Sequence, residues 1–204
     1  TDQYFNGYTN KTVSFEPSGV YTIADTTNVV KCYPYNVLEY FSYNAENTDQ
    51  QQSLSSAYYV CREFLNKDTS IKTDYYLSDV RITGEGVLFC FGYCVSGMPV
   101  VIGGDIRNKY GIEHAMEVLV SGNNVRKFKK YNSNFAEDRN FDENIYIDFL
   151  TAVNYSMVLK GGDNNQIDGI VFGYYLNGET DENLSGICWF VNIDSTVYII
   201  DTED

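Results

Sequence analysis

The sequence predicts an α+β protein in which two similar units each pack one helix against an antiparallel sheet. Aromatic residues are abundant, with 19 tyrosines and 12 phenylalanines among 204 residues, and such side chains favour the half-buried surface of a sheet. Two segments carry helical periodicity, and each precedes a strand that contains Phe-Gly-Tyr, at residues 91–93 and 172–174. We therefore expect units at about residues 1–135 and 140–204, packed as one globule through these two strands and Trp189.

The first fifty residues predict short strands joined by turns. Val13 to Phe15 and Val20 to Ala24 flank the Pro17-Ser18-Gly19 turn, and Val29 to Tyr33 is a further β-rich run. Residues 44–52 are polar and predict a loop before the first helix.

The first helix begins after Ser53, because a serine hydroxyl can accept a hydrogen bond from a free N–H of the first turn. Apolar residues then recur at three- and four-residue spacing, which is typical of one buried helix face. These residues are Leu54, Tyr58, Cys61 and Leu65. The apolar stripe ends near Asn66-Lys67.

The next segment predicts a central strand. A strand at 77–83 leads through the Gly84-Glu85-Gly86 turn to residues 87–96, which are apolar at nearly every position. A strand without alternation is covered on both faces, so we place residues 87–96 in the middle of a sheet.

A hairpin follows this strand. Residues 97–99 turn the chain and residues 100–102 resume an extended course. Residues 112–120 and 125–131 then flank Ser-Gly-Asn-Asn, which is a strong hairpin signal.

The second unit begins after the polar, acidic segment at 132–142. A helix is predicted over 143–159, ending at Gly161-Gly162. The residues expected near one face, the face that would pack on the sheet, are Ile147, Leu150, Val153, Asn154 and Met157 or Val158. Three strands are predicted to close the chain, at 169–176, 186–193 and 196–201.

The charge of the chain argues against nucleic acid as a partner. The formal net charge is −14, from 28 acidic and 14 basic residues, and such a field repels a phosphate backbone. No stretch approaches the roughly 20 apolar residues that cross a bilayer. Because the chain begins Thr1-Asp2 without a signal peptide, we expect membrane attachment only through a segment absent from this sequence.

The cysteines predict free thiols. Their number is odd and their density is low for a disulfide framework; they are Cys32, Cys61, Cys90, Cys94 and Cys188. Cys90 and Cys94 share one strand face about 13 Å apart, at about 3.3 Å per residue, so they cannot pair.

No residue is assigned a catalytic role. The sole histidine, His114, is predicted on a strand face with Met116 and Val118, away from Glu113 and Glu117. Cys61 lies on the apolar stripe of the first helix, whereas activated thiolates occupy positive or helix-N-terminal sites. We therefore expect a structural histidine rather than a Cys–His catalytic pair.

We also expect no metal and no cofactor. Cys90 and Cys94 lack a second Cys/His pair at zinc spacing. The acidic loops at 163–168 and 179–183 lack the central glycine and terminal glutamate of a calcium loop. Gly103-Gly104 and Gly84-Glu85-Gly86 are interpreted as turns without a following helix, so no phosphate-binding loop is predicted.

One basic cluster stands out against the acidic background. It comprises Arg126, Lys127, Lys129 and Lys130. Lysines protect the exposed edge of a sheet, so an edge strand is the first interpretation. The second is a contact surface for an acidic partner or a membrane.

An ordered series of motifs runs from residue 76 to the end of the chain. It consists of Phe-Gly-Tyr at 91–93 with a Gly-Met-Pro turn at 97–99, a hairpin at 112–131, a helix, Ile-Val-Phe-Gly-Tyr-Tyr at 170–175, Trp189, and Val-Tyr-Ile-Ile at 197–200. The series resembles the extracytoplasmic YycI/YycH family of Gram-positive regulatory proteins over about residues 76–204. Residues 188–190 depart from that pattern, as Trp189 lacks the family's preceding proline and following arginine.

The resemblance implies a function without catalysis. Proteins of this family are membrane-anchored and restrain a sensor kinase of cell-wall homeostasis. We therefore expect an extracytoplasmic protein-binding module whose partner is a sensor kinase or a paralogous anchored protein. The alternative is a carboxylate-dependent hydrolase of unknown substrate, because the fold could bring two of the 28 acidic residues together.

Overall fold

A computed structural model describes residues 2–5, 10–34, 36–43, 53–132, 135, 147–161, 166–176, 184–194 and 196–201. Its strands are β1 (Thr12–Phe15), β2 (Tyr21–Ala24), β3 (Asn28–Cys32), β4 (Val37–Ser42), β5 (Asp74–Thr83), β6 (Gly86–Val95), β7 (Met98–Ile102), β8 (Met116–Ser121), β9 (Asn124–Tyr131), β10 (Ile167–Leu176), β11 (Leu184–Ile193) and β12 (Thr196–Asp201). Its helices are η1 (Asp2–Tyr4), α1 (Leu54–Lys67), α2 (Gly104–Tyr110) and α3 (Phe149–Lys160).

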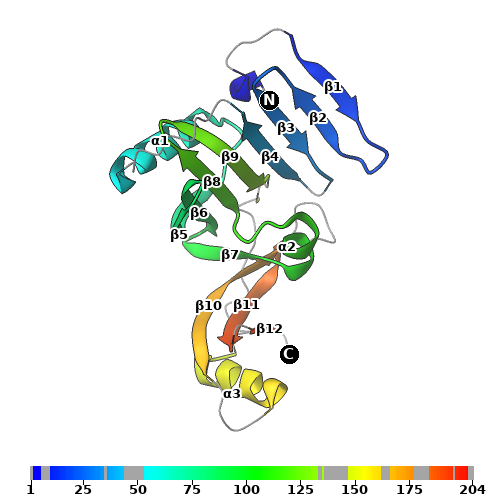
Figure 1. The fold of residues 1–204 in the computed structure, drawn as a ribbon. Helices are drawn as coiled ribbons and strands as arrows, with labels where there is room; N and C mark the ends of the chain where they lie inside the picture. Colours follow the sequence, from blue (N-terminus) through cyan, green and yellow to red (C-terminus); the bar gives the residue numbers. More distant parts are fainter. Residues whose placement is uncertain are drawn as a thin grey trace.

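The described strands form a single sheet rather than two. The order is β1-β2-β3-β4-β9-β8-β6-β7-β10-β11-β12, and β5 pairs with β6 outside this path. β1–β4 and β10–β12 lie at opposite ends of the molecule, and β9, β8, β6 and β7 connect them in that order (Figure 1). The expected fold class, two similar helix-packed antiparallel units, is therefore wrong.

The physical reason for this difference lies at β6 and β7. One edge of β6 pairs with β5, while its other edge pairs first with β8 and then with β7. β7 thus keeps a free edge, and β10 joins it in parallel through Tyr174↔Val100 and Leu176↔Ile102. Residue patterns predict strands but do not reveal which edges pair. Whether residues 1–135 and 140–204 behave as separate domains stays a prediction.

The main core lies between one face of this sheet and α1. Ser53 caps α1, its Oγ accepting from Ser56 N at 3.2 Å, and the helix ends at Lys67 as predicted. Tyr58 packs on Phe89 and Phe64 packs on Phe128, with ring centroids 5.5 and 5.2 Å apart. Aromatic residues therefore serve mainly as sheet packing at this end of the molecule.

The central position of residues 87–96 is confirmed. β6 is buried along most of its length and has strands on both edges. The glycines of both Phe-Gly-Tyr segments mark close approaches: a Cβ on Gly92 would lie 2.6 Å from the Tyr76 ring, and one on Gly173 would lie 2.2 Å from Pro99 O. These neighbours come from strands, not from a covering helix.

Three of the described elements, η1, β4 and α2, are absent from the predictions. β4 lies between β3 and β9. α2 follows Gly103, so the expectation of a turn without a helix is wrong there. α2 has seven residues and is followed at its C-terminus by Gly111, whose φ of 57° suits glycine.

The second helix also differs from its prediction. α3 begins at Phe149 because Asp148 caps it, its Oδ1 accepting from Leu150 N and Thr151 N. The residues that face the protein are Ala152 and Ser156. Leu150 and Val158, which were expected on the buried face, are exposed. No helix among the described residues is long and apolar enough to span a bilayer.

Candidate functional site

A row of polar side chains crosses the sheet on the face opposite α1. Directly opposed residues on neighbouring strands share a face of a sheet, and the row is Lys31, Glu39, Lys129, Glu117, Cys90 and Asp79. Opposite charges alternate along its first four members, which favours their side-by-side packing. Cys90 is fully buried near one end of this row.

An irregularity in β5 brings Asp79 to Cys90. Leu77 opposes Phe91 and Asp79 opposes Cys90, so Ser78 is an extra residue in the strand, a β-bulge. Regular pairing would place Ser78 opposite Cys90 and turn Asp79 to the α1 face. The bulge therefore aligns Asp79, Cys90 and Glu117 across three strands.

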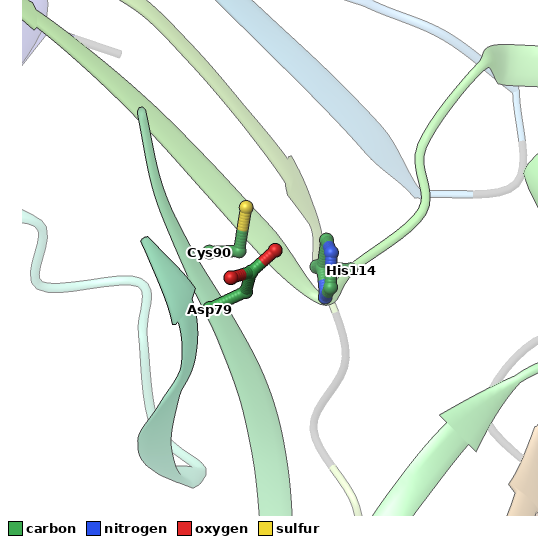
Figure 2. A group of neighbouring side chains, drawn as sticks. All are labelled: Asp79, Cys90 and His114. Atoms are coloured by element: carbon green, nitrogen blue, oxygen red, sulfur yellow. The ribbon is translucent and has the colours of Figure 1, made fainter. Parts of the chain in front are cut away.

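His114 closes the group from a loop between α2 and β8. Glu117 Oε1 accepts from the backbone N–H groups of Glu113 and His114, at 2.8 and 3.2 Å, and so fixes this loop. The prediction that His114 lies on a strand is wrong, because β8 begins only at Met116. Figure 2 shows Asp79, Cys90 and His114 converging, and their ligand atoms lie within 4.8 Å of one another.

Ser78 determines the orientation of the imidazole. Its hydroxyl donates to Cys90 O at 3.0 Å, and its Oγ lies 3.2 Å from His114 Nδ1. Because the hydroxyl proton is used, Oγ accepts from Nδ1–H, and the lone pair of the neutral ring lies on Nε2. The His114 Nε2 lone pair faces the Arg81 guanidinium at 3.4 Å.

Arg81 supplies the positive charge of the site. Its guanidinium donates to Asp79 Oδ2 at 2.6 Å and to Glu113 Oε2 at 3.2 Å. The hydrogen bond from Arg81 lowers the pKa of Asp79. Burial raises the pKa of the Cys90 thiol to about 11 and lowers that of His114. At neutral pH the group thus holds a thiol, a neutral imidazole and a paired carboxylate.

This arrangement suits the binding of a metal ion better than nucleophilic catalysis. An activated cysteine needs a lowered pKa and a base that takes its proton, and burial acts against both here. Thiol, imidazole and carboxylate are, however, the side chains that bind zinc. A hollow of about 510 Å³, lined by Arg81, Gly104, Arg107, Asn108, Gly111, Glu113 and His114, adjoins the group and α2.

A second polar group is buried on the α1 face. The Lys130 ammonium donates to Asp68 Oδ2 at 2.5 Å and also to Ser70 Oγ, and both partners of the ion pair have almost no exposed side-chain surface. Tyr4 and Gln3 donate to the same carboxylate, each at 2.7 Å. The group therefore ties η1, the end of α1 and β9 together.

We expect this carboxylate to make folding pH-dependent. Burial would raise the pKa of Asp68, but hydrogen bonds from Lys130, Ser70 and Tyr4 outweigh it and lower the pKa to about 2. A depressed carboxyl pKa stabilises the fold above the unfolded value, about 3.9, and this stabilisation is lost as pH falls towards 2. Between pH 5 and 2, urea titrations should show a loss about 2 to 3 kcal/mol larger than in Asp68→Asn. Equal losses in the two proteins would contradict the ion pair.

The lysines of the basic cluster lie on a strand inside the sheet and face acidic residues of this chain. β9 lies between β4 and β8, so the edge-strand interpretation is wrong. Lys127 pairs with Glu85 at 3.5 Å, Lys129 opposes Glu117, and Lys130 is buried with Asp68.

The cysteines, the acidic loops and Trp189 are the remaining features that were predicted from the sequence. Cys61 is buried in α1, where burial raises its thiol pKa to about 12, and all five cysteines are free. The loop at 179–183 and residues 163–165 lie outside the described residues. Trp189, expected to be buried, is partly exposed; its Nε1 donates to Ile147 O at 2.8 Å and its ring packs on Phe149 and Phe172.

An apolar surface that the predictions did not foresee lies on α3. The side chains on its solvent face include Leu150, Tyr155, Val158 and Leu159, with exposed fractions of 66, 53, 78 and 57%. The opposite side packs on β11 and β12 through small residues. α3 lies at the far end of the molecule from β1 (Figure 1). We call these four residues the α3 face.

Comparisons with known proteins give one structural likeness. No protein-family model and no curated protein matches the chain. The solved C-terminal domain of YpeB from Bacillus megaterium is similar, with a TM-score of 0.47 and 14% identity over 98% of this chain and 88% of that domain. A likeness at this level does not assign a function.

Proposed function

We propose that this chain is a non-enzymatic protein-binding module of an extracytoplasmic regulatory protein, and that the α3 face is its contact surface. The exposure of the α3 face is the observation that carries the proposal. Large contiguous apolar surfaces are uncommon on monomeric proteins and mark interaction sites.

The composition of α3 supports this role. A helix on the surface of a soluble protein normally has one apolar and one polar side, whereas a helix that is apolar all round is normally buried all round. α3 buries Ala152 and Ser156 against the sheet and leaves leucine, valine and tyrosine outside. A partner that covers the α3 face would complete its burial.

The shape of the surface favours a groove as its complement. Leu150, Asn154 and Val158 follow one another at i, i+4 spacing, and Thr151, Tyr155 and Leu159 form the adjacent row. Helices bind into apolar grooves through such rows. With a net charge of −14 on this chain, a basic rim around the groove would speed association.

The chemistry of the Asp79–Cys90–His114 group is consistent with a non-enzymatic function. Its thiol is buried and protonated, and its carboxylate is neutralised by Arg81. The resemblance to the YycI/YycH family then suggests the finer identity of the partner, a sensor kinase or a paralogous anchored protein.

The proposal is tested by measuring the binding of this chain to two kinds of extracytoplasmic domain from its source bacterium, that of the cell-wall sensor kinase and those of paralogous anchored proteins. We expect Val158→Lys to weaken binding at least about tenfold, because a charge replaces a contact in an apolar interface. Val13→Lys is the matched control, since it replaces another exposed valine by the same charge on β1, at the opposite end of the molecule from α3. Biolayer interferometry with purified proteins measures both.

Two results would contradict the proposal. One is equal weakening by Val158→Lys and Val13→Lys, which would indicate a general charge effect. The other is absence of binding together with turnover in a glycan or peptide hydrolase screen, which would favour the hydrolase alternative.

A further inference from the structure

We propose that Asp79, Cys90 and His114 bind a zinc ion in competition with the side chain of Arg81. The inference does not depend on the binding role of α3, because the two sites lie on different elements. It rests on the donor set, on the distances among the donors, and on the groups that hold them.

The donors match zinc in type and spacing. Zinc in proteins takes thiolate, imidazole and carboxylate ligands, and the thiolate disfavours magnesium and calcium. A tetrahedral ion with ligands at about 2.0–2.3 Å places ligand atoms about 3.3–3.8 Å apart. The donors here lie within 4.8 Å of one another, so a contraction of about 1 Å completes the site. His114 lies outside the strands, where such movement is easiest.

The surrounding hydrogen bonds prepare the imidazole as a ligand. Metal-binding histidines usually donate their second ring N–H to an oxygen, which fixes the ring and directs the other nitrogen at the metal. Ser78 Oγ accepts from His114 Nδ1 here, and Ser78 is itself held by Cys90 O. The bulge at Ser78 thus both aligns Asp79 and orients His114.

The charge balance of the site also favours a cation. Asp79 and Glu113 pair with Arg81, whose guanidinium lies beside Asp79 and His114 Nε2, and Glu117 adds a further carboxylate at the His114 loop. The guanidinium therefore already occupies the cation position between two of the donors. When zinc enters, Arg81 keeps Glu113 as its partner, the Cys90 thiol proton passes to solvent, and water takes the fourth position beside the hollow at α2.

The expected consequence is a clamp on the loop that carries His114. Zinc would link β5, β6 and the segment between α2 and β8, which are now joined there by hydrogen bonds and by Arg81. Ligands that bind only the folded state raise its stability by mass action. Saturating zinc should therefore raise the melting temperature of the wild-type chain.

Metal titration of the purified full chain tests this inference. Co²⁺ serves as an optical probe, and we expect a sulfur-to-cobalt charge-transfer band at one ion per chain. Zn²⁺ should displace the bound Co²⁺, which absorption spectroscopy follows as loss of the band and calorimetry follows as heat of exchange. Cys90→Ser should abolish the band, and His114→Asn should weaken Zn²⁺ binding about 100-fold or more. Cys94→Ser, on the same strand, is the matched control and should leave the band intact.

Arg81→Gln gives the most discriminating result. Removal of the competing cation should tighten Zn²⁺ binding about tenfold, because like charges a few ångströms apart repel each other. A zinc site elsewhere on this acidic chain would not show this gain. Circular dichroism establishes that each variant is folded. A cobalt spectrum without a sulfur band, or equal Zn²⁺ affinity in wild type and His114→Asn, would overturn the inference.

Discussion

Replacement of Lys130 by alanine will lower the free energy of unfolding by about 3 to 5 kcal/mol, because it leaves the Asp68 carboxylate buried without its cation. Lys130 is fully buried, and Asp68 is 1% exposed at its side chain. Tyr4, Gln3 and Ser70 would still donate to the carboxylate, but they carry no positive charge. Urea denaturation at pH 7 measures the loss.

Lys127→Ala is the matched control on the same strand. Its ion pair with Glu85 is 3.5 Å long and half exposed, and such pairs contribute about 0 to 1 kcal/mol. The double variant Asp68→Asn/Lys130→Met should recover part of the loss, since it removes the uncompensated buried charge while an amide oxygen still accepts from Tyr4 and Ser70. Similar stabilities for Lys130→Ala and Lys127→Ala would show that Lys130 is not buried with Asp68.

The second large effect concerns the junction between β7 and β10. A Cβ at Gly173 would lie 2.2 Å from Pro99 O and 3.2 Å from Pro99 C, both of them backbone atoms of β7. The neighbouring residues Tyr174 and Val100 are paired in parallel, so the strands cannot separate locally without loss of these pairs. We expect Gly173→Ala to cost about 3 kcal/mol or more.

Gly169→Ala provides the comparison on the same strand. No atom lies within 4 Å of the Cβ position there, and alanine is less costly than glycine in a strand by about 0.5 to 1 kcal/mol. The control should therefore be neutral or slightly stabilising in thermal and urea unfolding. If both variants were equally stable, the continuous sheet through β7 and β10 would be wrong.

The elements that were predicted correctly have strong local signals. α1 combines a capping serine with a regular apolar stripe, and β6 has an uninterrupted apolar run. α2 lacked such a signal, because its seven residues contain only one buried apolar side chain, Ile106. The start of α3 differs from the prediction although Asp148 is a good N-cap. The reason is that Ile147, just before the cap, is spaced from Leu150 as if both belonged to one helix.

The candidate site could not be assembled from the sequence for a different reason. Asp79, Cys90 and His114 are far apart in the chain, and the bulge at Ser78 reverses the face that strand alternation assigns to Asp79. His114 was placed on a strand that in fact begins two residues later. The sequence does not distinguish Lys130 from Lys127, because both are lysines of one strand. Lys130 is buried only because the fold brings Asp68, at the end of α1, next to it.

Hydrogen–deuterium exchange of the chain in complex with its extracytoplasmic partner tests the proposed binding role most directly. The account predicts slowed exchange over residues 149–160, where the α3 face becomes covered, with little change in β1 and β2 at the opposite end of the sheet. Protection confined to other elements, with α3 exchanging as in the free chain, would contradict it.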